Sequence, residues 1–371
     1  MIITKSKRSA LALMGLMLML ALVVAACGGD DPAPTSAPAA AAPAAAVAVP
    51  RSTPLPTPTS IPPKPTPVPK PVLIFSDLNW DSAQVQNAVA RHILEEGYGY
   101  ETDAVFGGTL PLMQALMDGD TNVTMEIWLP NQQAAYDAAI AAGTITAIGN
   151  SLEDNWQSGF IIPQYTADAN PGLLKVGDLK KPEYSSLFVT PDSKGKARNL
   201  GCIPGWECEV VNEKKILAYG LEDSVMVVNP GSGEALSAEV RAAFTKKEDI
   251  LFYYWGPTTL SNDLVKDLGG YVKLEEPAYS VECWEADTGC AYPTAEVLIV
   301  VRSELVASAP DAVAFLKNWD FNAGNQLAVE GHIADSGAEY DEAAVWFVNN
   351  TEEWKSWVAA GVADKVLAAS K

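Results

Sequence analysis

Short apolar runs alternate with amphipathic stretches through most of the chain after residue 71, and this alternation limits the fold more than any other feature. The apolar runs predict strands at 72–75, 123–128, 159–163, 224–229, 250–255 and 297–301. Stretches with helical spacing of apolar residues predict helices at 82–93, 109–118, 132–142, 209–219 and 237–244, and through most of the chain after 301. Strands and helices that alternate in this order favour an α/β fold with mainly parallel sheets.

The first 26 residues have the layout of a secretory signal. Basic residues near the start precede an apolar run over 10–26, which ends in Val-Ala-Ala directly before Cys27. A cysteine in this position resembles a bacterial lipobox, which implies cleavage before Cys27 and acylation of its thiol. The run is also long enough for a single transmembrane anchor. Either arrangement places the rest of the chain outside the cytoplasm.

Residues 27–71 are rich in proline and alanine, and from 54 to 71 a proline stands at nearly every second or third position. Such a segment buries no core and favours extended polyproline geometry. We interpret it as a semi-rigid tether between the membrane and a folded body; a proline-rich recognition ligand is the alternative. About 300 residues then remain, enough for two domains or one domain with two lobes.

The net charge and the cysteines narrow the function. A formal charge of −21 argues against nucleic acid or an anionic membrane surface as partner. Two close cysteine pairs, expected to be disulfides in an oxidising compartment, are Cys202 with Cys208 and Cys283 with Cys290. Zinc is the alternative, but neither His92 nor His332 lies near a pair, so we expect no metal or cofactor.

Several tryptophans lie where predicted strands end. Trp128 and Trp255 each close a strand, and Trp80 follows the first strand by a few residues. In α/β sheets ligands bind in the crevice beyond the carboxyl ends of the strands. We therefore expect these indoles to face one edge.

The segment around Trp206 adds a second kind of recognition. Trp206 lies in a turn between cysteines, just before the predicted helix start at Glu207 and Cys208. Indole faces attract cations, whereas the first N–H groups of a helix favour anions. A cation cage of Trp128, Trp206 and Trp255 with an amide nest suits a betaine. The side chains of Glu207 and Glu209 are expected to point away, because they would repel the ligand's carboxylate.

Tryptophan is more often a core residue than a ligand contact, and this alternative applies to each indole. It is the interpretation we adopt for the helical C-terminal region, whose tryptophans are Trp319, Trp346, Trp354 and Trp357. Trp284 lies inside the second cysteine loop and is expected to cover it. Trp156 stays unassigned.

Three segments carry a family resemblance. GCIPGWECE at 201–209, FYYWGPTTL at 252–260 and GDTNVTMEIWLPNQQAAY at 119–136 resemble the glycine betaine/proline betaine-binding proteins of ABC importers. The likeness covers most of residues 72–371. It implies a type II periplasmic-binding-protein fold, with two lobes around a hinged cleft. We place lobe 1 at 72–164 plus 277–371 and lobe 2 at 165–276.

The resemblance also implies roles for particular residues. Trp128 from one lobe, with Trp206 and Trp255 from the other, would form the cage, and the amides of Glu207 and Cys208 would take the carboxylate. In the subgroup with a cysteine pair around this turn, a histidine follows the first cage tryptophan by four positions. Here Gln132 stands there, an uncharged donor. Trp80 resembles an early tryptophan of related choline-binding proteins.

The resemblance implies an extracytoplasmic, lipid-anchored, monomeric protein that captures a small quaternary ammonium compound and delivers it to a permease and ATPase for osmoprotectant uptake. Choline, carnitine or an arginine-like solute is the alternative ligand, and an acidic side chain at the cage, such as Glu126, would favour choline. A ligand sensor of the same fold is a second alternative. The chain shows no serine-hydrolase or zinc-protease motif, so an exported hydrolase would depend on carboxylates alone, and we expect no enzyme.

Overall fold

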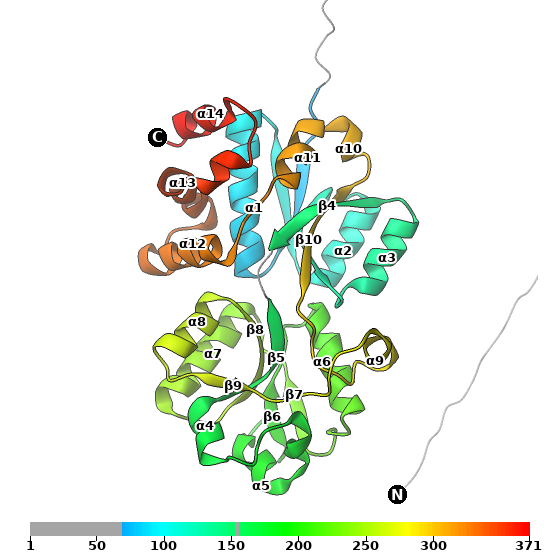
Figure 1. Ribbon diagram of the computed structural model, residues 1–371, viewed down its shortest axis with the longest axis vertical. Helices are drawn as coiled ribbons and strands as arrows, with labels where there is room; N and C mark the ends of the chain where they lie inside the picture. Colours follow the sequence, from blue (N-terminus) through cyan, green and yellow to red (C-terminus); the bar gives the residue numbers. More distant parts are fainter. Residues whose placement is uncertain (1–68, 153–155) are drawn as a thin grey trace, which may run out of the picture. The chain divides into compact units, whose positions relative to one another are not determined.

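The computed structural model describes residues 69–152 and 156–371. The predicted signal at 1–26, the lipid site Cys27 and nearly all of the tether at 27–71 lie outside these residues. The described chain contains two five-stranded mixed sheets, each covered by helices (Figure 1). The predicted α/β class is confirmed, but the sheets are mixed and not mainly parallel, because two of the four strand pairings in each sheet are antiparallel.

The first sheet has the order β2-β1-β3-β10-β4. Its strands are β1 (Leu73–Leu78), β2 (Thr102–Gly107), β3 (Val123–Leu129), β4 (Ile145–Leu152) and β10 (Glu296–Arg302). The helices of this lobe are α1 (Asp81–Ile93), α2 (Thr109–Asp118), α3 (Gln133–Ala141), α10 (Leu305–Ser308), α11 (Pro310–Lys317), α12 (Ala323–Ser336), α13 (Tyr340–Asn350) and α14 (Val362–Ala369). Pairing is parallel among β2, β1 and β3, and antiparallel where β10 joins β3 and β4.

The second sheet has the order β7-β6-β8-β5-β9. Its strands are β5 (Gln157–Pro163), β6 (Ala197–Leu200), β7 (Val225–Val228), β8 (Leu251–Gly256) and β9 (Tyr271–Lys273). Its helices are α4 (Gln164–Ala169), α5 (Pro182–Ser185), α6 (Glu207–Ala218), α7 (Gly233–Lys246), α8 (Thr259–Lys266) and α9 (Val281–Ala286). Here too three strands pair in parallel, and β5 is antiparallel to both β8 and β9.

The lobe boundaries differ from the predicted ones at both crossings. Residues 157–163 form β5, which pairs with β8 and β9 and so belongs to the second lobe. The segment after 277 also starts in the second lobe, because Tyr292 packs on Tyr253 with ring centres 5.5 Å apart. An apolar run predicts that a strand forms, but its partners are chosen by pairing across the chain, which sequence spacing does not reveal.

Local signals explain where the helices near the site begin and end. Gly119 ends α2 in the left-handed region at φ 91°, which glycine adopts without steric cost. Ser232 caps α7, because its side chain accepts a hydrogen bond from the backbone N–H of Ala235, and the helix therefore starts earlier than predicted. β2 was not predicted, because its two large apolar residues, Val105 and Phe106, are both exposed at the sheet edge.

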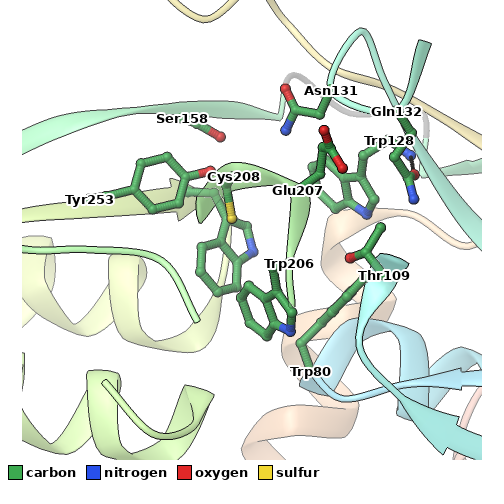
Figure 2. A pocket seen from close by; sticks show the side chains of 11 residues that line it. Trp80, Thr109, Trp128, Asn131, Gln132, Ser158, Trp206, Glu207, Cys208 and Tyr253 are labelled. Atoms are coloured by element: carbon green, nitrogen blue, oxygen red, sulfur yellow. Dashed lines mark hydrogen bonds between the residues drawn. The ribbon is translucent and has the colours of Figure 1, made fainter. Parts of the chain in front are cut away.

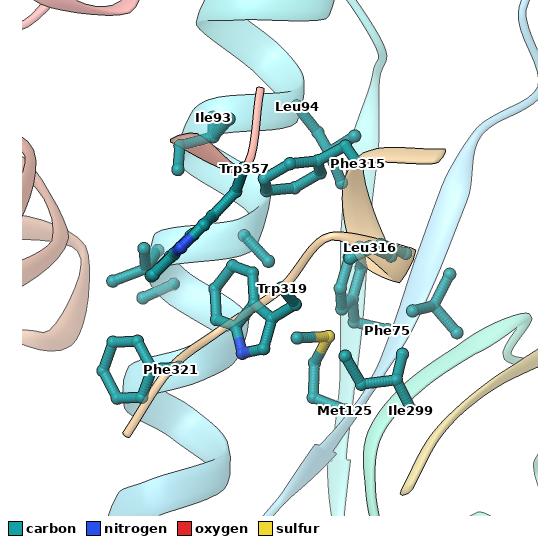
Figure 3. Packing of buried hydrophobic residues seen from close by; sticks show 14 of the residues in the cluster. Phe75, Ile93, Leu94, Met125, Ile299, Phe315, Leu316, Trp319, Phe321 and Trp357 are labelled. Atoms are coloured by element: carbon teal, nitrogen blue, oxygen red, sulfur yellow. The ribbon is translucent and has the colours of Figure 1, made fainter. Parts of the chain in front are cut away.

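The core of the first lobe packs the sheet against α1 and the C-terminal helices. Figure 3 shows Trp319 and Trp357 beside Phe315 and Phe321, with Met125 and Ile299 of the sheet beneath. Trp319, Trp354 and Trp357 are all buried, which agrees with their predicted role in packing. Trp346 is half-buried and stacks on His332 with ring centres 4.3 Å apart.

Candidate functional site

Residues from both lobes line one small cavity of about 50 Å³ (Figure 2). The first lobe contributes Trp80, Thr109, Trp128, Asn131 and Gln132. The second lobe contributes Ser158, Trp206, Glu207, Cys208, Tyr253 and Trp255. The cavity therefore brings together all seven residues that the sequence singled out for ligand contact.

Trp80 and Trp128 are held by one buried carboxylate. Their indole N–H groups donate to the same oxygen, Oε2 of Glu126, at 2.7 and 2.8 Å. Glu126 is fully buried in β3 and does not itself line the cavity. The two rings therefore stand between this carboxylate and the cavity, and their orientations depend on it.

The indoles form an aromatic surface that continues across the two lobes. The ring centre of Trp206 lies 5.0 Å from that of Trp80 and 5.3 Å from that of Trp255, both edge to face. Trp255 in turn stacks on Tyr254 at 4.5 Å. Edge-to-face and offset contacts of this kind are favourable because the positive ring edge meets a negative face. The negative faces left at the cavity suit a cation.

The turn before α6 places backbone amides at the cavity. Glu207 and Cys208 are the first two residues of α6, so their N–H groups have no acceptor one turn earlier in the helix. Gly205 has a left-handed backbone conformation, with φ 89°. The carbonyl oxygen of Gly205 would lie 3.0 Å from a Cβ added at Gly108, so the turn packs closely against the first lobe. The Cys202–Cys208 disulfide closes this turn, so the amides are fixed in a compact loop.

The two glutamates of this turn behave differently, and the prediction for Glu207 was wrong. Glu209 turns away from the cavity, because its carboxylate accepts from Gly205 N–H at 2.9 Å and from the Asn229 side chain at 3.0 Å. Glu207 instead lines the cavity together with Trp128 and Asn131 (Figure 2). Burial raises the pKa of the Glu207 carboxyl, partly offset by the charge of Lys214. The cavity thus has an acidic side chain beside the α6 amides.

Gln132 is oriented by the backbone. Its Oε1 accepts from the N–H of Trp128 at 2.6 Å, so its remaining group is the amide NH2, a donor only. Gln132 is buried and lines the cavity near the end of β3. It can therefore donate to an anionic group but cannot supply charge.

Sequence reasoning missed four lining residues: Thr109, Asn131, Ser158 and Tyr253. Tyr253 could have been found, because it precedes Trp255 by two residues on β8 and alternate strand residues share a face. Ser158 of β5 is the register partner of Trp255 of β8. That pairing had no signal in the sequence, since it depends on which strands become neighbours.

The second cysteine loop supports the cavity from behind. Lys215 is fully buried, pairs with Glu276 at 2.9 Å, and lies 4.5 Å from the ring centre of Tyr292. Tyr292 packs on Tyr253, and burial raises the pKa of Tyr253 to about 12.

Cys283 and Cys290 form the predicted bridge. Trp284 covers this loop as predicted, with its ring 5.6 Å from that of Tyr292.

Two features are absent from the residues that the structure describes. None of their helices is both long and apolar enough to cross a membrane. Within the same residues no cluster of histidine, cysteine and acidic side chains has the arrangement of a metal site.

Two α/β lobes that share one aromatic cavity define a solute-binding protein of the periplasmic-binding type. The chain belongs to the OpuAC family, described as the substrate binding domain of ABC-type glycine betaine transport systems, whose model matches residues 71–350. It is therefore a substrate-binding protein of an ABC transporter.

Individual relatives agree with this assignment. The chain is 32% identical to the glycine betaine-binding periplasmic protein OusX of Dickeya dadantii, over 66% of this chain and 76% of that protein. It is 26% identical to the trimethylamine N-oxide-binding protein of Pelagibacter ubique, over 74% of this chain and 87% of that protein. A solved ABC-transporter choline-binding protein in complex with choline shares the fold, with a TM-score of 0.65 and 20% identity over 81% of this chain and 98% of that chain.

Proposed function

We propose that this protein captures glycine betaine or a closely related quaternary ammonium compound in the cavity between its lobes. The supporting observation is the convergence of four indoles, Trp80, Trp128, Trp206 and Trp255, on one cavity beside the first amides of α6. A trimethylated ammonium has no N–H donors, so an aromatic cage desolvates it without leaving a hydrogen bond unmade.

The magnitudes are consistent with useful affinity. A cation–π contact contributes about 0.5–1 kcal/mol when exposed and about 2 kcal/mol or more when desolvated. Four such faces can supply much of the roughly 8 kcal/mol that corresponds to a micromolar dissociation constant. The carboxylate of a betaine would accept from the amides of Glu207 and Cys208 and from the NH2 of Gln132. Those donors distinguish a betaine from a simple cation.

Choline is the second candidate, and the Glu207 side chain favours it. A carboxylate at the cavity attracts a net positive ligand, and it repels the carboxylate of a betaine unless Glu207 is protonated. Trp80, which lines the same cavity, matches the early tryptophan noted above for choline-binding proteins. Trimethylamine N-oxide, which a relative is named for, has the same trimethylated head and belongs in the same comparison.

The cell-biological part of the proposal follows from the N-terminal sequence and the family. The mature chain would be anchored by lipid at Cys27, with residues 27–71 as tether, and would act as a monomer that delivers its ligand to a permease and ATPase. Radiolabelled palmitate should label the wild-type protein in its host and not Cys27→Ala. Label on both proteins would contradict the anchor assignment.

Calorimetric titration of the purified protein with glycine betaine, choline, carnitine and trimethylamine N-oxide tests the ligand. We expect micromolar binding of glycine betaine, with choline weaker. If choline binds more tightly, the result supports the aromatic cage but contradicts the carboxylate-binding role of the Glu207 and Cys208 amides. If none of these ligands releases or absorbs heat at any temperature tried, and none shifts the melting temperature, the quaternary ammonium assignment is wrong.

A further inference from the structure

Glu126 is a fully buried carboxylate with only neutral partners. Its Oε2 accepts from the indoles of Trp80 and Trp128, and its Oε1 accepts from the Nε2 of Gln86 at 2.7 Å. No basic side chain among the residues that the structure describes forms an ion pair with it. A buried charge without a counterion is costly, and side chains of this kind are normally paired.

All three hydrogen bonds are donated to Glu126. An indole N–H can only donate, and the orientation of Gln86 shows that its amide donates as well. The Oε1 of Gln86 accepts from Ser151 Oγ at 2.8 Å and from the indole N–H of Trp319 at 2.9 Å. Its other amide group must therefore be the NH2 that faces Glu126. A carboxylate surrounded by donors is arranged to carry negative charge, although burial opposes ionisation.

We propose that the cationic head of the ligand is the missing counterion of Glu126, and that Glu126 strengthens the selection for positive charge beyond what the ring faces and Glu207 provide. The inference rests on the proposed function. The cage rings of Trp80 and Trp128 separate Glu126 from the cavity, so the ammonium and the carboxylate would face one another across two indoles. Hydrogen bonding of each indole N–H to an anion also polarises the ring toward greater electron density.

The arrangement predicts a difference between two ligands of the same shape. Choline carries a quaternary nitrogen, and 3,3-dimethyl-1-butanol has a carbon in its place and is neutral. Both fill an aromatic cage equally well, but only choline interacts with the charge of Glu126. A site that read shape alone would lose affinity for both ligands when the rings are disturbed.

The chain itself offers a matched variant that separates charge from hydrogen bonding. In the double variant Q86E/E126Q, the amide oxygen at 126 still accepts from both indoles, and its NH2 donates to the new carboxylate at 86. That carboxylate still accepts from Ser151 and Trp319. Each of these five hydrogen bonds is kept, while the negative charge moves one side chain away from the cage. Glu126→Gln alone removes the charge but places two NH2 groups opposite each other.

The inference is tested by calorimetry on the wild type and both variants. Choline is titrated directly, and 3,3-dimethyl-1-butanol is measured by competition. We expect Q86E/E126Q to bind choline about tenfold more weakly, equivalent to about 1.4 kcal/mol, and the neutral alcohol as before. Glu126→Gln should lose at least as much choline affinity. Thermal unfolding of each unliganded variant checks that it folds. If the double variant does not fold, the choline and alcohol affinities of Glu126→Gln decide the question.

The other outcomes are distinguishable. Unchanged choline affinity in a folded double variant would overturn the counterion role and leave the proposed function intact. Equal losses for choline and the alcohol would show that Glu126 only positions the rings, which also overturns the inference. A wild-type protein that binds no quaternary ammonium compound would remove the proposed function and this inference together.

Discussion

Trp206 of the second lobe donates its indole N–H to the side-chain oxygen of Asn79 in the first lobe, over 2.5 Å. The bond connects a cage ring to the opposite lobe, so the cage is complete only when the lobes are arranged in this way. The backbone N–H of Leu110 adds a second link, to the carbonyl oxygen of Gly205 at 3.2 Å. Binding and lobe arrangement are therefore coupled at the cage itself.

Removal of the Asn79 acceptor should weaken ligand binding. A hydrogen bond of this kind contributes about 0.5–1.5 kcal/mol, so Asn79→Ala should raise the dissociation constant for glycine betaine about fivefold. Asn79→Asp keeps the acceptor and should retain most of the affinity. Calorimetry on both variants measures the effect. Equal losses in the two variants would show that the acceptor is not what matters.

The cage tryptophans should contribute to binding individually. Trp255→Ala is expected to cost about 1–3 kcal/mol of binding free energy, because it removes one cation-facing ring. Trp206 is 4% exposed and packs in the second-lobe core, so its alanine variant should also lower the stability of the unliganded protein. Trp346→Ala, in a half-buried indole away from the cavity, is the control and should leave the dissociation constant unchanged. A similar loss in the control would mean that the effect is general.

The Cys202–Cys208 bridge should matter more for ligands with a carboxylate. The bridge closes the loop that carries the Glu207 and Cys208 amides, so Cys202→Ser with Cys208→Ser should loosen the anion nest. We expect a several-fold loss of glycine betaine affinity and a smaller loss for choline. Titration of both ligands gives the ratio. A loss that is equal for the two ligands would argue against a carboxylate at these amides.

A carboxylate from the first lobe caps a helix of the second. Glu330 of α12 accepts from the backbone N–H of Thr259, the first residue of α8, at 3.0 Å, and from its hydroxyl. A negative charge at a helix N-terminus contributes about 0.3–2 kcal/mol. Glu330→Gln should therefore speed ligand release several-fold, as measured by stopped-flow tryptophan fluorescence. Release at the wild-type rate would mean that this contact does not hold the lobes.

Binding of cations should weaken in acid. Burial raises the pKa of Glu126 above 4.5, and it also raises that of Glu207. Each carboxyl is therefore protonated in the folded protein as pH falls through its raised pKa, and the negative charge that attracts a cation is lost. Choline affinity should fall over this window, whereas binding of neutral 3,3-dimethyl-1-butanol should not.

The same shifts fix the sign of a stability effect. Because the folded protein holds these protons more tightly than the unfolded chain, their contribution to stability is present below pH 4.5 and is lost as pH rises through the raised pKa values. The increase in melting temperature caused by choline should accordingly grow with pH. A ligand-induced increase that is independent of pH would contradict the raised pKa values.

The sequence by itself determined the local elements and the residue types of the site. Helical and strand periodicity located β3, β8 and α2 closely, since these depend on neighbouring residues within a few positions. Trp80 and Trp128 could be placed at one edge because β1 and β3 are parallel and their carboxyl ends share it. Trp255 ends β8 in the other sheet, so the expectation of a single shared edge was wrong for it. The strand β2 was not predicted, because an exposed edge strand has little alternation of apolar and polar residues.

Only the tertiary structure decided which residues meet. The pairing of β5 with β8 brings Ser158 beside Trp255, and the packing of the lobes turns Glu207 into the cavity although a carboxylate there appeared unfavourable. The placement of Glu126 behind both Trp80 and Trp128 depends on two segments, because Trp128 is on the same strand as Glu126 whereas Trp80 lies 46 residues earlier in the chain. Residue spacing reports local geometry, whereas desolvation and charge compensation depend on groups that only folding brings together.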